Sequence, residues 1–451
     1  MERILSAERF GPLVGEFGRD RVKDAVALHL ADLRARKTPW DEDRAVTAAE
    51  SALSASTRST LRRVINGTGV IIHTNLGRSP IDPSLWEAAA DLTAGYSNLE
   101  LDLASGERGS RDDHLSALCR SLFGCEAAIL TNNNAAGTML LLAAVAAGRE
   151  VIVSRGELVE IGGSFRVPDV IQQGGAKLRE VGTTNRTRVR DYAEAITRKS
   201  AAMLRVHRSN FDIVGFTETP DVAGLVDLSR ARRVPLLYDE GSGRVVDLSR
   251  YGFARAPVLA ELIALGVDAI TCSTDKLIGA TQGGLILGRE ALIAKCRRHP
   301  LMRALRAGKE TYAIVAATLR AFATGKHEEQ VPIYRMLSTP LATLRARADE
   351  IIGGTACTAV ESQCVLGGGT TPAETIPSVA VEVPGDASAL YSRFLENDPP
   401  ILGRVQNDRF TIDMRTVLET DTSAVRAALV GEGIRDQESG VRAFPPESPS
   451  A

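Results

Sequence analysis

Short apolar runs alternate with longer helical stretches between residues 61 and 325, and this alternation restricts the possible folds more than any other feature of the chain. The runs have the length and composition of buried strands: 150–154, 203–206, 234–238 and 268–271. Helical stretches, such as 135–147 and 221–233, separate them. Strands that alternate with helices form a mostly parallel sheet with helices on both faces. Ligands of such sheets bind at the carboxyl ends of the strands, so the residues after each run are the candidates for a site.

Residues 1–60 predict a small helical unit ahead of this region. One helix face carries apolar side chains at helical spacing: Val22, Val26, Leu30 and Leu33. Pro39 ends that helix, and a second helical stretch follows Trp40. The first 63 residues contain twelve Lys or Arg and ten Asp or Glu, a balance too weak to indicate nucleic-acid binding from charge alone.

The pattern of residues 326–440 predicts a smaller α+β domain. Alternating runs at 378–383 and 409–414 are typical of half-buried strands, and a helix is expected near 423–430. Residues 441–451 are rich in Pro, Ser and Glu and predict a disordered tail.

The composition favours a reduced cytoplasmic protein. No run of about 18 or more apolar residues occurs, and the first residues lack the apolar core of a secretory signal. The six cysteines form no CxxC pair and the six histidines are scattered, so no metal site is predicted. A net charge of -2 argues against a protein that coats nucleic acid non-specifically.

Three features at strand ends indicate one kind of chemistry. Asp239 follows the run 234–238, and Lys276 follows the next predicted strand beside a Gly-rich loop. An Asn cluster ending at Asn134 precedes an apolar helix, with Asn134 as the predicted cap and free backbone N–H groups for an anion. Each feature alone is also typical of a surface turn or an ordinary helix cap. Their order on successive β/α units predicts a pyridoxal phosphate enzyme, in which the lysine forms a Schiff base and the aspartate keeps the pyridine nitrogen protonated.

The sequence resembles the bacterial selenocysteine synthases, the L-seryl-tRNA(Sec) selenium transferases. The similarity runs nearly continuously from residue 60 to 420. Its most specific segments are INGTGVIIHTNLGRSP (65–80), YSNLELDLASGERGSR (96–111), NNNAAGTMLLLAA (132–144), HRSNFDIVGFT (207–217), STDKLIGATQGGLILG (273–288) and RHPLMRALRAGKET (298–311). The chain departs from the usual family pattern at Gly67, at Thr281 and at Glu240, which stands beside Asp239 where the family usually has leucine.

The resemblance implies a fold-type I pyridoxal phosphate enzyme with a tRNA-binding domain in residues 1–60, a catalytic domain in 61–325 and an α+β domain in 326–440. It implies a ring-shaped homodecamer that acts on seryl-tRNA(Sec) and selenophosphate. The expected catalytic residues are Lys276, as the Schiff-base lysine, with Asp239 and Asp275. Further cofactor contacts are expected from Asn133, Asn134, Ala135, His207 and Ser209.

Selenophosphate requires an anion site beside the cofactor. Arg303 and Arg306 are three residues apart in a predicted helix, which places them on one helical face, and guanidinium groups suit tetrahedral oxyanions. Without the resemblance, a solvated basic helix face explains the same spacing. The resemblance adds Arg78 to this clamp.

The reaction implied by the resemblance is a β-replacement on the seryl group while it remains attached to tRNA. The Lys276 amine takes the α-proton, the serine hydroxyl leaves, and selenium from selenophosphate adds to the resulting double bond. Two other functions fit part of the sequence. A pyridoxal phosphate lyase for a small phosphorylated amino sugar or amino acid needs the same lysine and aspartate but not residues 1–60. A non-catalytic RNA-binding protein needs neither Lys276 nor Asp239.

Overall fold

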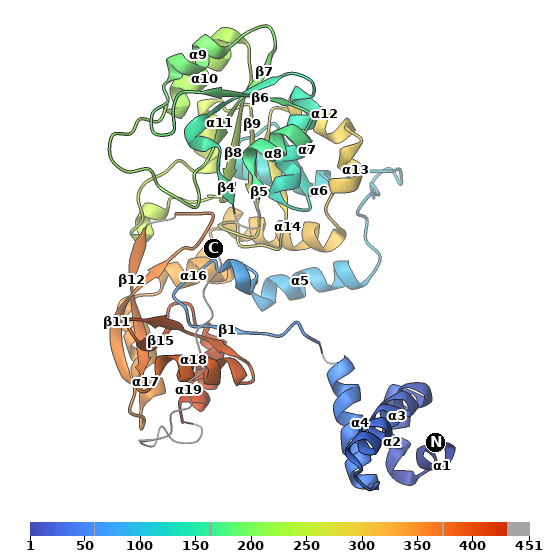
Figure 1. The fold of residues 1–451 in the computed structure, drawn as a ribbon. Coiled ribbons are helices and arrows are strands. Elements are labelled where there is room, and N and C mark those ends of the chain that lie inside the picture. Colours follow the sequence, from blue (N-terminus) through green and yellow to red (C-terminus); the bar gives the residue numbers. More distant parts are fainter. Residues whose placement is uncertain (58, 162–164, 372–373, 431–451) are drawn as a thin grey trace. The chain divides into compact units, whose positions relative to one another are not determined.

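The computed structural model describes residues 1–57, 59–161, 165–371 and 374–430 (Figure 1). The chain divides into two compact units, Met1–Arg63 and Val64–Ala451. The predicted tail at 441–451 lies outside the described residues. None of the helices in the described part of the chain combines the length and apolar character that a membrane crossing needs.

The first unit is helical, as its periodicity predicts. Its helices are α1 (Glu2–Leu5), α2 (Gly11–Phe17), α3 (Arg19–Arg36) and α4 (Glu42–Thr57). On α3, Val22 and Val26 are buried, whereas Leu30 and Leu33 are half-buried. Helix α3 ends before Pro39, through Lys37 in a left-handed conformation. The buried side chains of this unit form their own apolar cluster.

The second unit is built on a seven-stranded sheet in the order β2-β10-β9-β8-β7-β3-β6. Its strands are β2 (Ala127–Thr131), β3 (Glu150–Ser154), β6 (Lys177–Val181), β7 (Ser200–Val206), β8 (Leu236–Gly241), β9 (Ala269–Ser273) and β10 (Gly284–Gly288). Strand β10 is antiparallel to both neighbours, and the other pairs are parallel. The carboxyl ends of β2, β8 and β9 therefore lie at the same edge of the sheet.

Helices cover both faces of this sheet, which confirms the predicted layer arrangement (Figure 1). One face packs against α6 (Asp113–Phe123), α9 (Val189–Ala195), α10 (Val222–Arg232), α11 (Leu259–Leu265) and α14 (Lys309–Ala323). The other packs against α7 (Asn134–Ala146), α8 (Val167–Gln173), α12 (Glu290–Arg298) and α13 (Leu301–Leu305). Because both faces are covered, β9 and β10 are buried along their whole length.

The last part of the chain forms an antiparallel sheet in the order β11-β12-β15-β14. Its elements are β11 (Thr358–Val365), β12 (Thr375–Val383), β14 (Arg404–Gln406), β15 (Arg409–Asp413), α17 (Leu341–Ile352), α18 (Ala387–Glu396) and α19 (Thr422–Val430). Strand β1 (Ile65–Asn66) pairs with β13 (Ile401–Leu402), a contact that the sequence did not indicate. The second unit also contains helices α5 (Pro83–Ala94), α15 (His327–Gln330) and α16 (Pro332–Ser338). A separate antiparallel pair is formed by β4 (Glu160–Ile161) and β5 (Phe165–Arg166).

Candidate active site

Lys276 lies in the turn after β9 and is buried, with 6% of its surface exposed. Its Nζ donates to the Gly369 carbonyl at 3.4 Å. Burial lowers the pKa of Lys276, and the positive charge of Arg78 lowers it further. A lowered pKa makes the neutral amine more available, and the neutral amine is the form that acts as nucleophile and base. The environment of Lys276 therefore suits covalent chemistry.

Asp239 lies at the carboxyl end of β8 and is also buried. Its Oδ1 accepts hydrogen bonds from Asn134 Nδ2 at 2.8 Å and from Thr271 Oγ1 at 3.3 Å. Its Oδ2 lies 3.4 Å from the Thr138 hydroxyl. Burial raises the pKa of Asp239, and the Asn134 hydrogen bond opposes this effect. A buried carboxyl oriented by neutral donors is well suited to a cationic partner such as a protonated ring nitrogen.

The helix that follows the Asn cluster is capped by Asn133, so the prediction that Asn134 caps it is wrong. Asn133 has an extended backbone, and its side chain accepts from the Ala136 N–H at 2.8 Å. Asn134 is the first residue of α7, and its amide turns toward Asp239 instead. Ala135 lies in the same first turn. The N-terminus of α7 thus stands beside Asp239, where its N–H groups and dipole favour an anion.

The residues at this edge of the sheet fit pyridoxal phosphate. The cofactor needs an amine, a carboxylate at the ring nitrogen and a site for its phosphate. Lys276 and Asp239 can supply the first two, and the N–H groups at the start of α7 can form the phosphate site. The buried Oδ1 atoms of Asn134 and Asp275 have no hydrogen-bond partner among the residues that the structure describes. Buried polar atoms of this kind are rare unless a ligand or water satisfies them. These orphaned acceptors support a polar ligand at the site.

Arg78 lies in a strained turn and contacts Asp275, the residue before Lys276. Its Nη1 donates to Asp275 Oδ2 at 2.6 Å. Arg78 has a φ of 67° and follows Gly77 at 84°, although a left-handed conformation costs a non-glycine residue about 1–2 kcal/mol. Ser79 holds the turn in place, because its N–H and hydroxyl donate to the carbonyls of Asp275 and Lys276 at 3.2 and 2.6 Å. Strain maintained by such contacts is typical of functional sites.

Arg303 and Arg306 do not share a helical face, and that prediction is wrong. Helix α13 ends at Leu305, and Arg306 continues in extended backbone with a ψ of 144°. The chain leaves the helix there to form a bridge with Thr131, beside the Asn cluster. Arg306 Nη1 contacts Glu100 Oε1 at 3.0 Å, whereas Arg303 is exposed. Of the predicted clamp, only Arg78 contacts the residues around Lys276.

A glycine-rich loop at 367–371 closes over Lys276, and sequence reasoning missed it. His207 Nε2 lies 3.1 Å from the Thr370 carbonyl, and the Ser209 carbonyl accepts from the Gly369 N–H at 3.0 Å. The predicted cofactor residues His207 and Ser209 therefore hold this loop against the lysine. The signal in the sequence is the triplet Gly367-Gly-Gly, which directly follows the three apolar residues 364–366.

Gly369→Ala is expected to weaken retention of pyridoxal phosphate. A β-carbon at Gly369 would lie 2.4 Å from Lys276 Nζ, and the backbone φ of +87° already disfavours a side chain. The overlap and the strain each cost about 1 kcal/mol or more, so retention should fall by about tenfold or more. Titration of the apoprotein with the cofactor, followed by visible absorbance, measures the effect.

Gly368→Ala is the matched control, because a β-carbon there would meet only Thr74 Oγ1 at 3.8 Å. It should bind the cofactor as the wild type does. Equal retention by the two variants would contradict the close approach of Gly369 to the lysine.

Glu240, the residue after Asp239, bonds within its own turn. Its side chain is buried and turns back to accept from the Gly243 N–H at 2.5 Å and from the Ser242 hydroxyl. These contacts cap the turn after β8. The departure from the family pattern therefore adds a turn-stabilising carboxylate and leaves Asp239 in place.

Comparisons of the sequence with known proteins identify one family. Residues 64–418 match the family model described as SelA, L-seryl-tRNA selenium transferase. The L-seryl-tRNA(Sec) selenium transferase of Geobacter sulfurreducens is 43% identical over 448 residues, which cover 95% of this chain and 97% of that protein. The protein of the same name from Carboxydothermus hydrogenoformans is 38% identical and is covered to 97%, as is this chain.

A solved structure of D-glucosaminate-6-phosphate ammonia-lyase has the same fold. The match has a TM-score of 0.61 at 23% identity and covers 82% of this chain and 95% of the lyase. Identity at this level shows the fold alone, and the fold class expected from the sequence is confirmed. With a family model that matches most of the chain, this chain belongs to the L-seryl-tRNA selenium transferase family.

Proposed function

We propose that the chain converts L-seryl-tRNA(Sec) to L-selenocysteinyl-tRNA(Sec), with pyridoxal phosphate held by Lys276 and Asp239 and with selenophosphate as the selenium donor. As a member of its family the chain is a selenium transferase that acts on seryl-tRNA. The observation that supports the cofactor assignment is the buried Lys276 beside Asp239 at one edge of the sheet. Incubation with seryl-tRNA(Sec) and selenophosphate, followed by analysis of the released amino acid, tests the proposal.

When bound, pyridoxal phosphate withdraws electrons from the α-carbon of an amino acid, which makes loss of the α-proton and of the β-hydroxyl possible. The Lys276 amine would hold the cofactor and, once released, take the α-proton. Burial lowers the pKa of Lys276, which favours the neutral amine that this role requires. Asp239 would hold the ring nitrogen in its protonated form, and Asn134 and Thr271 fix the orientation of its carboxyl.

The phosphate of the cofactor is assigned to the start of α7, with Asn133, Asn134 and Ala135. His207 and Ser209 would act through the loop at 367–371, which they hold over Lys276. This loop excludes water from the lysine, so that a proton taken there is retained.

Selenophosphate is assigned to Arg78, Arg303 and Arg306. Asp275 orients Arg78 through the 2.6 Å contact, and this places a guanidinium next to the lysine. The backbone of Arg306 adjoins the residues before α7, because the Asn132 N–H donates to the Leu305 carbonyl at 2.8 Å. Arg303 is exposed one turn earlier. Arg306 thus starts beside the residues that precede α7, and a bound donor would have to draw the side chain of Arg303 toward it.

The alternative of a lyase for a small phosphorylated amino sugar is less well supported. A solved lyase of this kind matches the chain in fold at 23% identity, whereas relatives at 38–43% identity carry the selenium transferase name over nearly their whole length.

The proposal also includes a homodecamer in the cytoplasm, where aminoacyl-tRNA is found. Light scattering on the purified protein measures the oligomeric state.

Asp239→Asn is expected to lower turnover by about 100-fold while the cofactor stays bound, because an amide cannot stabilise the protonated ring nitrogen by charge. Turnover and cofactor absorbance are measured on the same sample. Glu240→Gln is the matched control, since it removes the neighbouring buried carboxylate, which caps a turn. Near-normal turnover in Asp239→Asn together with a loss in Glu240→Gln would transfer the role to Glu240.

A further inference from the structure

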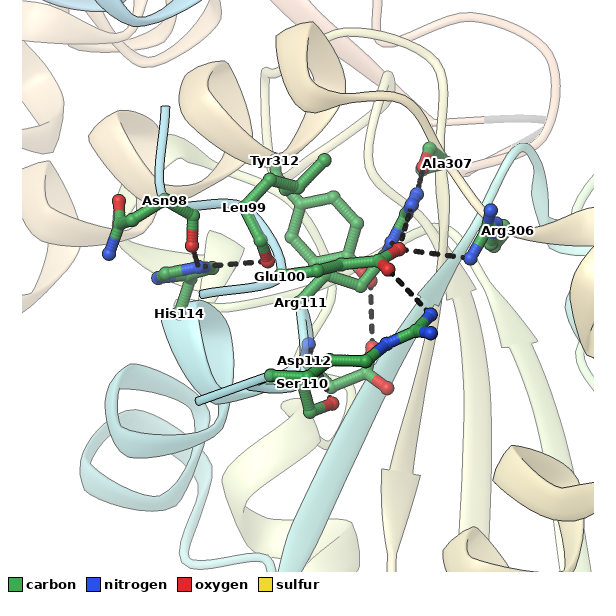
Figure 2. A network of polar contacts seen from close by, with 11 residues as sticks. Asn98, Leu99, Glu100, Ser110, Arg111, Asp112, His114, Arg306, Ala307 and Tyr312 are labelled. Atoms are coloured by element: carbon green, nitrogen blue, oxygen red, sulfur yellow. Dashed lines mark hydrogen bonds and ion pairs between the residues drawn. The ribbon is translucent and has the colours of Figure 1, made fainter. Parts of the chain in front are cut away.

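Glu100 lies at the centre of an arginine cluster outside the lysine turn (Figure 2). Its Oε1 accepts from Arg111 Nε at 3.0 Å, from Arg111 Nη2 and from Arg306 Nη1 at 3.0 Å. Its Oε2 accepts from Arg108 Nη2 at 2.8 Å. Three guanidinium groups therefore converge on one carboxylate, and the cluster keeps an excess of positive charge.

The carboxylate is ionised in this setting. The Arg111 guanidinium holds the pKa of Glu100 below its usual range, although partial burial opposes this effect. Glu100 is thus an anion bound to groups that recognise anions. The side chains of Glu100 and Arg306 are 28% and 26% exposed, so an ion from solution can reach their contact.

Glu100 and Arg111 are fixed more firmly than Arg306. His114 Nε2 lies 3.2 Å from the carbonyls of Asn98 and Leu99, which anchors the chain just before Glu100 (Figure 2). Arg111 binds Glu100 through two nitrogens and donates its Nη1 to the Ala307 carbonyl at 2.7 Å. Arg306 contributes a single nitrogen to Glu100. Of these two arginines, Arg306 is therefore the one that can change partner while Glu100 stays paired.

We propose that Glu100 is an internal counter-ion that a tetrahedral oxyanion displaces from Arg306, and that Glu100 thereby sets the affinity and charge selectivity of the donor site. This inference rests on the proposed function, which assigns Arg306 to selenophosphate. A dianion replaces the single contact of Arg306 with a stronger one, whereas a monoanion gains little over the carboxylate that is already there. Glu100 does not touch the reacting atoms in this account and acts through Arg306.

The displacement leaves no unpaired buried charge. Glu100 keeps the two nitrogens of Arg111 and the contact with Arg108 when Arg306 turns away. The exchange therefore breaks one half-exposed ion pair, and pairs of this kind contribute little to stability. The backbone of Arg306 forms a bridge with Thr131, so its side chain starts next to the residues that precede α7.

The test is equilibrium binding of inorganic monothiophosphate, a dianionic analogue of the donor, to the holoenzyme by calorimetry. Glu100→Gln keeps the shape of the side chain and removes its charge, so it should tighten binding by about tenfold, the size expected for one unit charge near a partly exposed site. Glu107→Gln removes the same charge from an exposed position on the same segment and should change binding by less than about twofold. Arg306→Ala should weaken binding.

A second variant separates competition from a structural role. Glu100→Ala should also bind monothiophosphate more tightly than the wild type, and added acetate should reverse this gain by taking the place of the missing carboxylate. Unchanged or weaker binding in Glu100→Gln, with weaker binding in Arg306→Ala, would overturn the counter-ion proposal alone and show that Glu100 only holds Arg306 in place. Unchanged binding in Arg306→Ala would instead contradict the assignment of the donor site.

Discussion

Lys276→Ala is expected to abolish both the visible absorbance of bound pyridoxal phosphate and selenium transfer. The amine at this position is proposed as both the anchor of the cofactor and the base for the α-proton, and alanine can do neither. Burial and the charge of Arg78 lower the pKa of Lys276, so the wild-type amine is already prepared for this chemistry. Selenium transfer by this variant should therefore fall below the detection limit.

Lys295→Ala is the matched control, because Lys295 is an exposed lysine on α12. It should keep full absorbance and full transfer. Borohydride reduction of the holoenzyme followed by peptide mapping identifies the bonded lysine directly. A label on any lysine other than Lys276 would show that the site is assigned to the wrong turn.

The parts of the site that follow from local pattern were predictable from sequence. Asp239 lies near the carboxyl end of β8, just after the apolar run 234–238, and Lys276 lies in the turn that follows β9. Parallel strands bring their carboxyl ends together, so both positions could be predicted from local pattern. The cap of α7 was misplaced by one residue, since Asn133 and Asn134 both have cap-forming side chains. Element ends are the least certain feature of any sequence pattern.

The parts that depend on contacts distant in sequence were not predictable. Gly369 and Lys276 are in contact although 93 positions separate them in the sequence, and 206 positions separate Arg306 from Glu100. No periodicity within either segment encodes these pairs, because they arise only when two separately folded elements pack together. The spacing of Arg303 and Arg306 suggested one helical face, but the bridge to Thr131 ends the helix between them. A tertiary contact thus overrode a local pattern.

The two compact units make it possible to test by deletion whether tRNA binding and catalysis reside in different parts of the chain. Residues 1–60 form their own apolar cluster, whereas Lys276, Asp239 and the arginines lie in the second unit. A tRNA is far larger than a cofactor site, so most of its contact must lie outside that site. The first unit holds none of the proposed catalytic residues, and tRNA binding is the role that we propose for it.

Deletion of residues 1–60 is expected to abolish binding of seryl-tRNA(Sec) and to leave the cofactor absorbance intact. The first 63 residues carry twelve basic and ten acidic side chains, so recognition should depend on shape with few phosphate contacts and a modest dependence on salt. Filter binding over a salt series measures both. The double variant Arg303→Ala/Arg306→Ala is the converse, because it should bind tRNA nearly as well as the wild type and fail to transfer selenium. If that variant lost tRNA affinity and still used selenophosphate, the two binding sites would be the reverse of those proposed.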